Sequence, residues 1–521
     1  MTVAFGIILV YILFSIFHFL ATGYAARWMK KEKEKNRKTE LDENDLPEIV
    51  IIIPALREVS LVEDTLDYFS KLKYSKDKYK IVFVTTAIET IGKKENRNRI
   101  EEYYKKINLQ NNMEEIGEYC EGLFPLSYLK EVEKIIGSDK SDSERIRELY
   151  ALYDSVPSTE AAIEKTIELN KEKYGNYYIV ECPITGMEVG KPTQLNYVIE
   201  HLSEVIGEYN KDRLLVGVYD FDSRPDLRTL SYIAVKEQEN KKQGRKPVDF
   251  YQQTQLPYKN IKDIDIISKS KNLMKANIIM YTRRALGIEI FKILRYRKHL
   301  EHGRFRLLRP IINCLGAGMF VEKETLKEIG GFAEPVEDLV LGYQLNIKNK
   351  YVEPIPYINI MQPYLFMKEM INSHSRIFMI GLRLYREGKH IEASKGQSVI
   401  PAVKEFIECM MWLLCCPIMW TTFIMCFVRG YIAIGFLLLI CVILLRFFGD
   451  YIVLMQETKR QISDYDGMEC SIDISHGQMF IMMLLTPLLG IIRFVSALVG
   501  VGKYIFFYVF HKKVYRKKTE R

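Results

Sequence analysis

The sequence predicts an α/β protein, with an open mixed sheet, helices on both faces of that sheet, and additional transmembrane helices. Two observations predict this class. Between about residues 48 and 390, continuous apolar and β-branched runs alternate with helical patterns, as in parallel sheets that are buried on both faces. Near both ends of the chain stand charge-free apolar runs of about 20 residues, the length that crosses a bilayer core.

The first apolar run covers residues 3–22 and carries no charge. A cleaved signal peptide has its basic residues before the apolar stretch, whereas here seven Lys/Arg against three Glu follow it within residues 26–40. Because positive flanks remain on the cytosolic side, we expect an uncleaved anchor at 1–25 and a basic cytosolic linker at 26–47. A buried core helix is the alternative for the first run.

The region 400–510 holds the remaining apolar runs. Residues 406–428 and 430–449 are two spanning candidates, and the block 479–510 is either a tight hairpin or one span with an interfacial helix. The basic tail at 511–521 also belongs in the cytosol. An even number of crossings after residue 400 satisfies both flanks, and four is the preferred count. The expected location is the inner or plasma membrane, multi-pass, with the soluble region in the cytosol.

The charge pattern argues against a nucleic-acid-binding protein. The formal net charge is +8, but the two basic flanks beside apolar runs carry more than all of it, so the soluble region is nearly neutral. The nine cysteines include no C-x-x-C pair, and the eight histidines show no zinc spacing. We therefore expect no nucleic-acid partner, no disulfide framework and no Cys/His metal site.

Strands and helices alternate along the soluble region. EIVIIIPA (48–55) and KIVFVTTA (80–87) are typical of buried parallel strands, and the short helical pattern between them completes a βαβ unit. A strand at 177–183, a helix at 191–206 and a strand at 214–220 continue the alternation. Sheets of this kind bind ligands at the carboxyl ends of their strands, which is where candidate functional residues are sought.

Residues 92–175 interrupt this alternation. They are rich in Glu, Lys, Asn and Tyr and predict helices with polar faces, with an exposed turn at 137–143. Charged helical faces are usually only solvated, so a solvated helical insertion is favoured over a lid or a module that docks a protein partner.

Asp220 and Asp222 directly follow the strand that ends near residue 219. Residues two apart in an extended segment point to the same side, so both carboxylates can face one site. A small number of oxygen ligands suits Mg²⁺ or Mn²⁺, whose coordination is completed by water and substrate phosphates. For this tripeptide alone, an exposed turn before Arg224 is the alternative.

Glu337 and Asp338 form a second candidate position, after the glycine-rich segment 316–332. Two acids at a helix start can simply suit the helix macrodipole. A carboxylate beside a bound sugar would instead act as a general base that deprotonates an acceptor hydroxyl. The glycines of the preceding segment fit a backbone that turns tightly or approaches a ligand closely.

Six short motifs resemble, in their order, the membrane-bound family 2 glycosyltransferases of the GT-A fold. The motifs are PALRE (54–58), GKPTQLN (190–196), DFD (220–222), GAG (316–318), GGF (330–332) and EDLVLG (337–342). The resemblance spans about 48–345 and implies a GT-A domain over 48–390 that contains the insertion. No G-x-x-x-x-G-K-[ST] sequence is present, which excludes a P-loop.

The resemblance implies a donor-binding role for several residues. Ala55 and Glu58 would lie against the base and ribose of a nucleotide-sugar donor, with a UDP-sugar preferred. Glu89 stands near the place of the acid that the family uses to contact the base. Lys191 would approach the donor, and Arg376 would pair with its diphosphate, unless it is only a basic residue on a helix beside the membrane.

The resemblance also implies an inverting, metal-dependent hexosyltransferase. Asp220 and Asp222 would hold the diphosphate through Mg²⁺ or Mn²⁺. Asp338, the acid that follows Glu337, would be the catalytic base. The acceptor would be a lipid-linked sugar, a lipid carrier or a surface glycan at the cytosolic face of the membrane.

One motif departs from the processive polysaccharide synthases of this family. Their Q-x-x-R-W element is matched by Ser373–Ile377, which keeps Arg376 but lacks both the glutamine and the tryptophan. Without the tryptophan, a stacking surface for the acceptor sugar is absent from the element. A transferase that adds one or a few sugars is therefore favoured over a synthase that elongates and translocates a polymer. A catalytically silent membrane scaffold is the third alternative.

Overall fold

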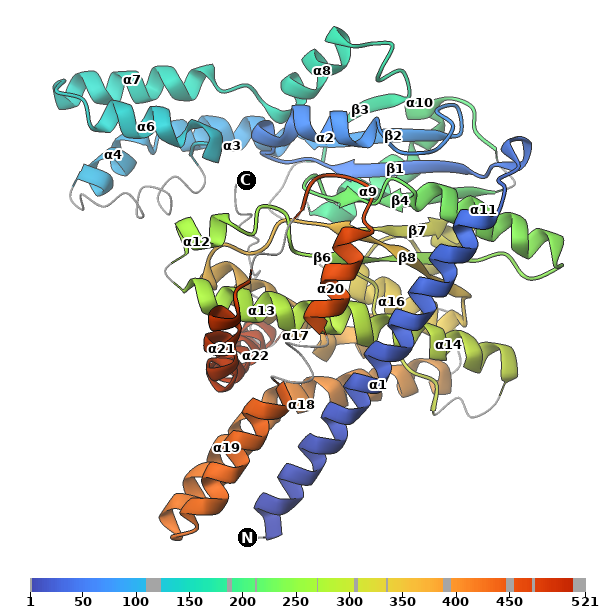
Figure 1. Cartoon of the computed structure of the whole chain (residues 1–521). Helices are drawn as coiled ribbons and strands as arrows, with labels where there is room; N and C mark the ends of the chain where they lie inside the picture. Colours follow the sequence, from blue (N-terminus) through green and yellow to red (C-terminus); the bar gives the residue numbers. More distant parts are fainter. Residues whose placement is uncertain are drawn as a thin grey trace. The chain divides into compact units, whose positions relative to one another are not determined.

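The chain divides into two compact units (Figure 1). The computed structural model describes all residues except 1, 109–122, 185–189, 211–212, 269, 304–307, 334–335, 388–394, 447–453, 471–473 and 509–521. The parallel unit covers residues 48–223, and the anchor unit covers residues 2–47 together with 224–508. The basic tail at 511–521 lies outside the described residues.

The parallel unit contains four parallel strands. They are β1 (Glu48–Pro54), β2 (Tyr79–Thr86), β3 (Tyr177–Cys182) and β4 (Leu214–Val218), in the spatial order β3-β2-β1-β4. The five interior residues of β1 are all buried, as an unbroken β-branched run predicts. All four strands expected from the sequence in this region are confirmed. Because β2 and β4 lie on opposite sides of β1, the strand order reverses between β1 and β4, where sheets of this class bind ligands.

Short helices connect these strands. They are η2 (Val59–Leu61), α2 (Val62–Phe69), α9 (Lys191–Glu200) and α10 (Leu202–Ile206). Phe69, the last residue of α2, packs against Tyr219 beyond β4, with the two ring centres 5.5 Å apart. Helix α9 packs on β1 and β2. The expected helix at 191–206 is therefore present, with a break at His201.

The insertion is helical and has a core of its own. Its elements are α3 (Ala87–Arg97), α4 (Ile100–Asn108), η3 (Leu126–Tyr128), α6 (Leu129–Ile136), α7 (Asp142–Ser155) and α8 (Thr159–Leu169). Aromatic and aliphatic side chains, among them Tyr103, Phe124 and Leu149, form this core. Ser141 begins α7 with a reciprocal capping box to Glu144. The helices expected from the sequence are confirmed.

The anchor unit contains strands that the sequence analysis did not find. They are β5 (Arg224–Pro225), β6 (Phe250–Leu256), β7 (Met319–Glu322) and β8 (Val352–Ile360), in the order β7-β6-β8-β5. Strand β6 is parallel to β8 and antiparallel to β7, and β5 is antiparallel to β8. The expected fold class, α/β with a mixed sheet and additional apolar helices, is confirmed.

Helices surround these strands in the anchor unit. They are η1 (Glu43–Asp45), α11 (Thr229–Lys242), α12 (Asp263–Ile267), α13 (Lys271–Arg283), η4 (Arg284–Glu289), α14 (Ile290–His302), α15 (Lys323–Ile329), α16 (Glu337–Lys348), α17 (Met367–Glu387), α20 (Leu454–Ser463) and α21 (His476–Leu484). A cluster of buried side chains from α1, α13, α20 and α21 forms one core of this unit.

Three helices among the described residues are long and apolar enough to cross a membrane, by length and composition. These segments are Phe5–Lys38, Ser398–Val428 and Thr486–Phe506, which lie in α1 (Thr2–Lys38), α18 (Lys395–Val428) and α22 (Thr486–Tyr508). Helix α19 (Ile432–Arg446) is apolar but shorter, and it packs beside α1 (Figure 1). The block 479–510 divides into α21 and α22. The number of crossings stays a prediction.

Helix α1 includes the basic segment after the first apolar run and ends only at Lys38. The sequence analysis had expected a separate linker at 26–47. Some cations of this segment bind within the anchor unit. Lys33 is only 5% exposed, forms an ion pair with Asp464 at 2.8 Å and donates a hydrogen bond to Gln461 at 2.6 Å. Arg37 also pairs with Asp464. Part of the positive flank therefore fastens the N-terminal helix to the segment that follows α20.

Gly342 lies where α16 meets the extended segment Ile312–Cys314. A Cβ atom at position 342 would lie 2.8 Å from the carbonyl oxygen of Ile312 and 2.9 Å from the amide nitrogen of Cys314. Because backbone atoms cannot move aside as a side chain can, Gly342→Ala should lower the free energy of unfolding by about 1–3 kcal/mol. The midpoint of thermal unfolding in detergent measures this loss.

Gly502→Ala is the matched control for this prediction. Gly502 is also helical, and a Cβ atom there would meet nothing within 4 Å. Its replacement should leave the midpoint unchanged or raise it slightly, because alanine favours the helix. Equal midpoints for Gly342→Ala and the unsubstituted protein would contradict the close packing at α16.

Candidate functional site

Lys191 and Asp220 form an ion pair beyond the carboxyl end of β4. The Lys191 Nζ atom lies 2.8 Å from Asp220 Oδ1, and the side chains are 14% and 40% exposed. Lys191 is the first residue of α9, and Pro192 presets the helical conformation in its first turn. The first turn of a helix also presents backbone N–H groups, so an anion at this place meets both the ammonium group and the helix dipole.

Asp222 is buried, at 1% exposure, two residues beyond Asp220. The intervening Phe221 packs into the core, with its ring 5.9 Å from that of Phe83, and its carbonyl accepts a hydrogen bond from Thr65 at 2.8 Å. The exposed turn that was the alternative for this tripeptide is therefore excluded. The two carboxylates therefore differ in exposure. Asp222 is buried, whereas the more exposed Asp220 forms the ion pair with Lys191.

Ala55 and Glu58 lie in the loop after β1. Ala55 is fully buried and donates its N–H to the carbonyl of Val84 at 2.8 Å, while the N–H of Glu58 donates to Thr159 Oγ1 at 2.9 Å. Arg57 between them has a φ of +56°, a left-handed conformation that costs a non-glycine residue about 1–2 kcal/mol. Strain of this kind persists only where the surroundings fix it, and it is concentrated at ligand sites.

The carboxylate of Glu89, in α3, binds both the insertion and the loop after β1. Its Oε1 atom accepts hydrogen bonds from the N–H and the hydroxyl of Thr159 at 2.7 and 3.0 Å. Its Oε2 atom accepts the N–H of Arg57 at 3.0 Å. The sequence analysis placed Glu89 against the base of a donor, and that contact stays a prediction beside this structural role.

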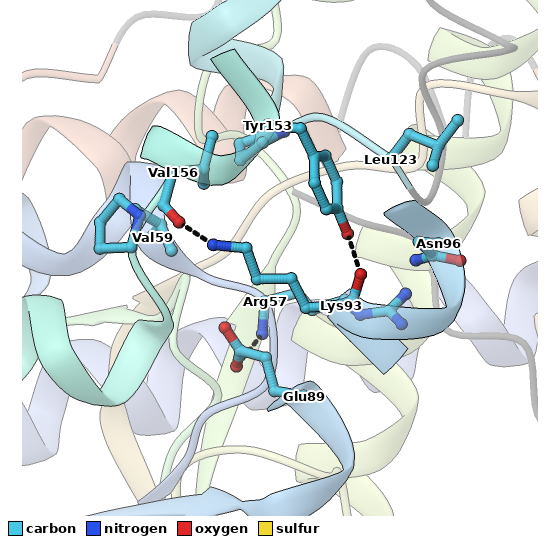
Figure 2. A pocket seen from close by; sticks show the side chains of 10 residues that line it. Arg57, Val59, Glu89, Lys93, Asn96, Leu123, Tyr153 and Val156 are labelled. Atoms are coloured by element: carbon cyan, nitrogen blue, oxygen red, sulfur yellow. Dashed lines mark hydrogen bonds between the residues drawn. The ribbon is translucent and has the colours of Figure 1, made fainter. Parts of the chain in front are cut away.

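A small, open pocket lies between the loop after β1 and the insertion (Figure 2). Its lining residues are Arg57, Val59, Glu89, Lys93, Asn96, Leu123, Pro125, Tyr153, Val156 and Pro157. Most of them belong to the insertion, and none belongs to a motif except Arg57. The sequence analysis missed the pocket because contacts between segments so far apart leave no signal in sequence spacing.

The pocket residues hold one another in place. Lys93 donates its ammonium to the carbonyl of Val156, and the Tyr153 hydroxyl donates to the carbonyl of Lys93 at 3.0 Å (Figure 2). Gly92 makes room for Arg57, because a Cβ atom at position 92 would lie 2.7 Å from the guanidinium nitrogen Nη2. The polar groups of this pocket are therefore fixed before any ligand arrives.

Glu337 and Asp338 lie in the anchor unit, at the start of α16. The Asp338 Oδ1 atom accepts the N–H of Leu339 at 2.8 Å, at the positive end of the helix dipole, and Glu337 is only 5% exposed. Burial, together with the charges of Asp338 and Glu289, raises the pKa of the Cys314 thiol well above its usual value. Asp338 is thus close enough to Cys314 to act on it electrostatically.

Buried glutamines of β6 hold the glycine loop at 316–318. The side-chain amide of Gln255 donates to the carbonyl of Ala317 at 2.7 Å. Gly318 has a φ of +68°, and a Cβ atom there would lie 2.7 Å from the side chain of Gln253, so glycine is required on both counts. The sequence analysis missed these glutamines, although a run of polar residues, QQTQ, in an otherwise apolar context was a signal.

Arg376 lies on α17 beside Lys503 of α22, close enough for the two charges to interact. The Lys503 ammonium donates to Ser375 Oγ at 2.6 Å. The ring of Trp412, from α18, lies 5.9 Å from that of His374 in an edge-on arrangement. An indole therefore lies beside this element, although the matched sequence motif has none.

The predicted residues divide between the two units. Those of the parallel unit lie at the carboxyl ends of its strands or in the loops and helices that follow them, and they are Ala55, Glu58, Glu89, Lys191, Asp220 and Asp222. Those of the anchor unit are Glu337, Asp338 and Arg376. Within the part of the chain that the structure describes, no three His, Cys, Asp or Glu side chains gather as a complete metal site.

Comparisons with known proteins give only distant likenesses. No protein-family model and no curated protein matches the sequence. The mannosyltransferase PcManGT from Pyrobaculum calidifontis, solved in complex with GDP-Man and Mn²⁺, superimposes with a TM-score of 0.44 and 13% identity over 94% of this chain and 99% of that chain. TarS 1–349 from S. aureus, solved alone and with UDP-GlcNAc, gives TM-scores of 0.35 and 0.34 at 10% identity, over 70% of this chain and 72% of that chain. Likenesses this weak assign no function.

The imidazole of His374 should make stability depend on pH. Burial lowers its pKa to about 3, and the charges of Arg493 and Arg284 act in the same direction. The unfolded chain binds a proton at this residue below a pH of about 6.5, whereas the folded protein does not. Stability should therefore fall as the pH drops from about 6.5 toward 3, by up to about 1.4 kcal/mol per pH unit from this group.

His374→Gln should remove this contribution. Midpoints of thermal unfolding measured between pH 7.5 and 5.5 should fall less steeply in the variant than in the unsubstituted protein, while replacement of the exposed His302 should leave the slope unchanged. Equal slopes for all three proteins would show that His374 takes up a proton in the folded state.

Proposed function

We propose that the chain is a membrane glycosyltransferase that moves a sugar from a nucleotide-sugar donor to a lipid-linked or glycan acceptor. The observation that carries the proposal is the Lys191–Asp220 ion pair beside the buried Asp222, at the edge of a parallel sheet where its strand order reverses. The six ordered motifs and the three long apolar helices support the same function.

Donor binding is assigned to the parallel unit. Asp220 and Asp222 offer carboxylate oxygens, the ligands that suit Mg²⁺ and Mn²⁺, and two protein ligands leave room for water and diphosphate oxygens. When bound, the metal would neutralise the charge that develops on the nucleoside diphosphate leaving group. Lys191, which lies beside Asp220, would bring its ammonium group to the same diphosphate.

The base is assigned to Asp338 of the anchor unit. Its carboxylate would take the proton of the acceptor hydroxyl while that oxygen bonds to the anomeric carbon. The bond from the anomeric carbon to the diphosphate oxygen would break on the opposite face, its electron pair leaving with the nucleoside diphosphate, so the configuration inverts. Arg376 would pair with the diphosphate of the donor.

A processive polysaccharide synthase is the second candidate. Trp412 of α18, which lies beside His374, offers the aromatic surface that the sequence motif lacks. Separation of the products by length decides between the two candidates, because a transferase that adds one sugar gives one discrete product and a processive synthase gives long chains. For both candidate functions, we expect the protein to lie in the inner or plasma membrane with its soluble region in the cytosol.

Asp338→Asn should abolish transfer of radiolabelled sugar to a membrane lipid extract, because the amide cannot accept the proton. Loss of a general base typically lowers turnover by about 10²–10⁴-fold. Donor binding, measured by calorimetry, should remain. Glu328→Gln, a change of an exposed acid in the same unit, serves as the control. Full turnover by Asp338→Asn would contradict the assignment of the base.

Asp220→Asn and Asp222→Asn should instead weaken metal-dependent donor binding. A lost charge-assisted contact is worth about 1.5–3 kcal/mol, which corresponds to roughly a tenfold to hundredfold higher Kd. Asp77→Asn, at an exposed site of the same unit, should change nothing. Donor affinity that is equal in all four proteins, with and without Mn²⁺, would contradict the metal site.

A further inference from the structure

Helix α14 of the anchor unit lies beside α1 and β8 (Figure 1). Its first turn contacts the apolar part of α1, because the ring of Phe291 meets those of Phe17 and Tyr24 edge-on, at 5.6 and 5.8 Å. In the same turn, Lys292 donates to Glu408 of α18 at 2.9 Å. Phe17 stands shortly before the end of one apolar run, and Glu408 stands at the start of another. The contacts of the first turn therefore place α14 beside the ends of two apolar runs.

One side of α14 is buried against the sheet of the same unit. Ile293, Leu294 and Tyr296 are buried on this side, and α14 packs against β8. Arg297 forms an ion pair with Glu353 of β8. The orientation of the helix about its own axis is therefore fixed by apolar packing and by one ion pair.

The other side of α14 carries two exposed cations, Arg295 and Lys298. With 3.6 residues per turn, both point away from the side that packs against β8. Neither has a hydrogen bond or an ion pair with any residue that the structure describes. The acid of this helix, Glu301, accepts the Tyr351 hydroxyl at 3.2 Å. The charge of the exposed side is therefore positive.

Helix α1 carries two further exposed cations near this place. Arg27 and Lys31 follow Tyr24 by about one and two helical turns, and Tyr24 is the residue that contacts α14. In the described part of the chain, no ion pair or hydrogen bond involves either of them. The exposed acid in this stretch, Glu34, lies 3.9 Å from Lys30. We call Arg27, Lys31, Arg295 and Lys298 together the cationic surface.

The position of the cationic surface favours a lipid over bulk solvent as its partner. A charged helical face is usually only solvated. Here, however, Phe291 and Lys292 hold α14 beside the ends of the apolar runs, which is where lipid headgroups begin. Tyr24 and Trp28 of α1 are aromatic residues of the kind that gather at this level. Cations at headgroup level attract anionic lipids.

We propose that the cationic surface binds the phosphate groups of anionic membrane lipids, and that α14 lies in the membrane interface as part of that surface. A zwitterionic lipid is bound more weakly, because its own cation balances the phosphate charge. The inference goes beyond sugar transfer, and it rests on that part of the proposed function which places α1 across a membrane.

Electron paramagnetic resonance with spin-labelled lipids tests the proposal on the full-length protein in phosphatidylcholine vesicles. Labelled phosphatidylglycerol and labelled phosphatidylcholine are added separately in trace amounts, and the spectrum separates lipid held at the protein from lipid free in the bilayer. Phosphatidylglycerol should be enriched at the protein over phosphatidylcholine. Added salt should reduce the enrichment, because the cations are exposed to solvent.

Two double variants assign the preference to the cationic surface. Arg295→Gln combined with Lys298→Gln removes the part on α14, and Arg27→Gln combined with Lys31→Gln removes the part on α1. Loss of one such cation corresponds to an attraction about fivefold weaker, so each double variant should lose most of the preference for phosphatidylglycerol. These side chains are exposed and have no partner among the described residues, so thermal unfolding should be unchanged.

Two control variants separate this surface from net charge and from side-chain shape. Lys130→Gln combined with Lys134→Gln removes the same charge from exposed positions of α6 in the insertion, and it should keep the preference. Arg295→Lys combined with Lys298→Arg keeps the charge of α14 and should keep the preference as well.

Three outcomes would overturn the proposal while the proposed function stands. The first is equal enrichment of the two lipids at the unsubstituted protein. The second is an unchanged preference in both double variants of the cationic surface. The third is an equal loss in the α6 control, which would assign the preference to net charge. Absence of protein-held signal from either lipid would instead contradict the membrane span of the proposed function, and this inference with it.

Discussion

Parallel pairing of β1 with both β2 and β4 is the constraint on which the candidate donor site depends. Parallel strands end at one edge of a sheet, so the segments after Pro54, Thr86 and Val218 meet there although they are far apart in the sequence. The unbroken β-branched run of β1, buried along its length, makes this pairing stable. The predicted ligand residues Ala55, Glu58, Glu89, Asp220 and Asp222 all lie in these three segments.

A single threonine links this edge to the insertion. Thr159 accepts the N–H of Glu58 and donates to Glu89, so the first turn of α8 is bound to the loop after β1 and to the helix after β2. A helical insertion with its own core is thereby fastened at the place where a ligand would bind. This accounts for a pocket wall formed mostly by side chains outside the sequence motifs.

Elements whose structure depends on a local sequence pattern could be predicted from the sequence. Apolar β-branched runs identified β1 and β2, and helical periodicity identified the insertion. Strand β6 was missed because its glutamines, which bind the loop at 316–318, interrupt the apolar pattern, and β8 was missed because its two prolines argue against a strand. The pocket was missed for another reason, since its residues meet only after folding. Lys33 illustrates the same limit, because its partner Asp464 is distant in sequence.

The proposed function requires that the chain uses a nucleotide sugar. Release of nucleoside diphosphate by the purified full-length protein in nanodiscs, across a panel of nucleotide sugars with a lipid extract as acceptor, tests it most directly. We expect release from one donor class, dependent on Mg²⁺ or Mn²⁺ and abolished by a chelator, because a metal held by Asp220 and Asp222 would neutralise the charge of the leaving group. Absence of release from every donor, with either metal and with lipid acceptor present, would contradict the proposed function.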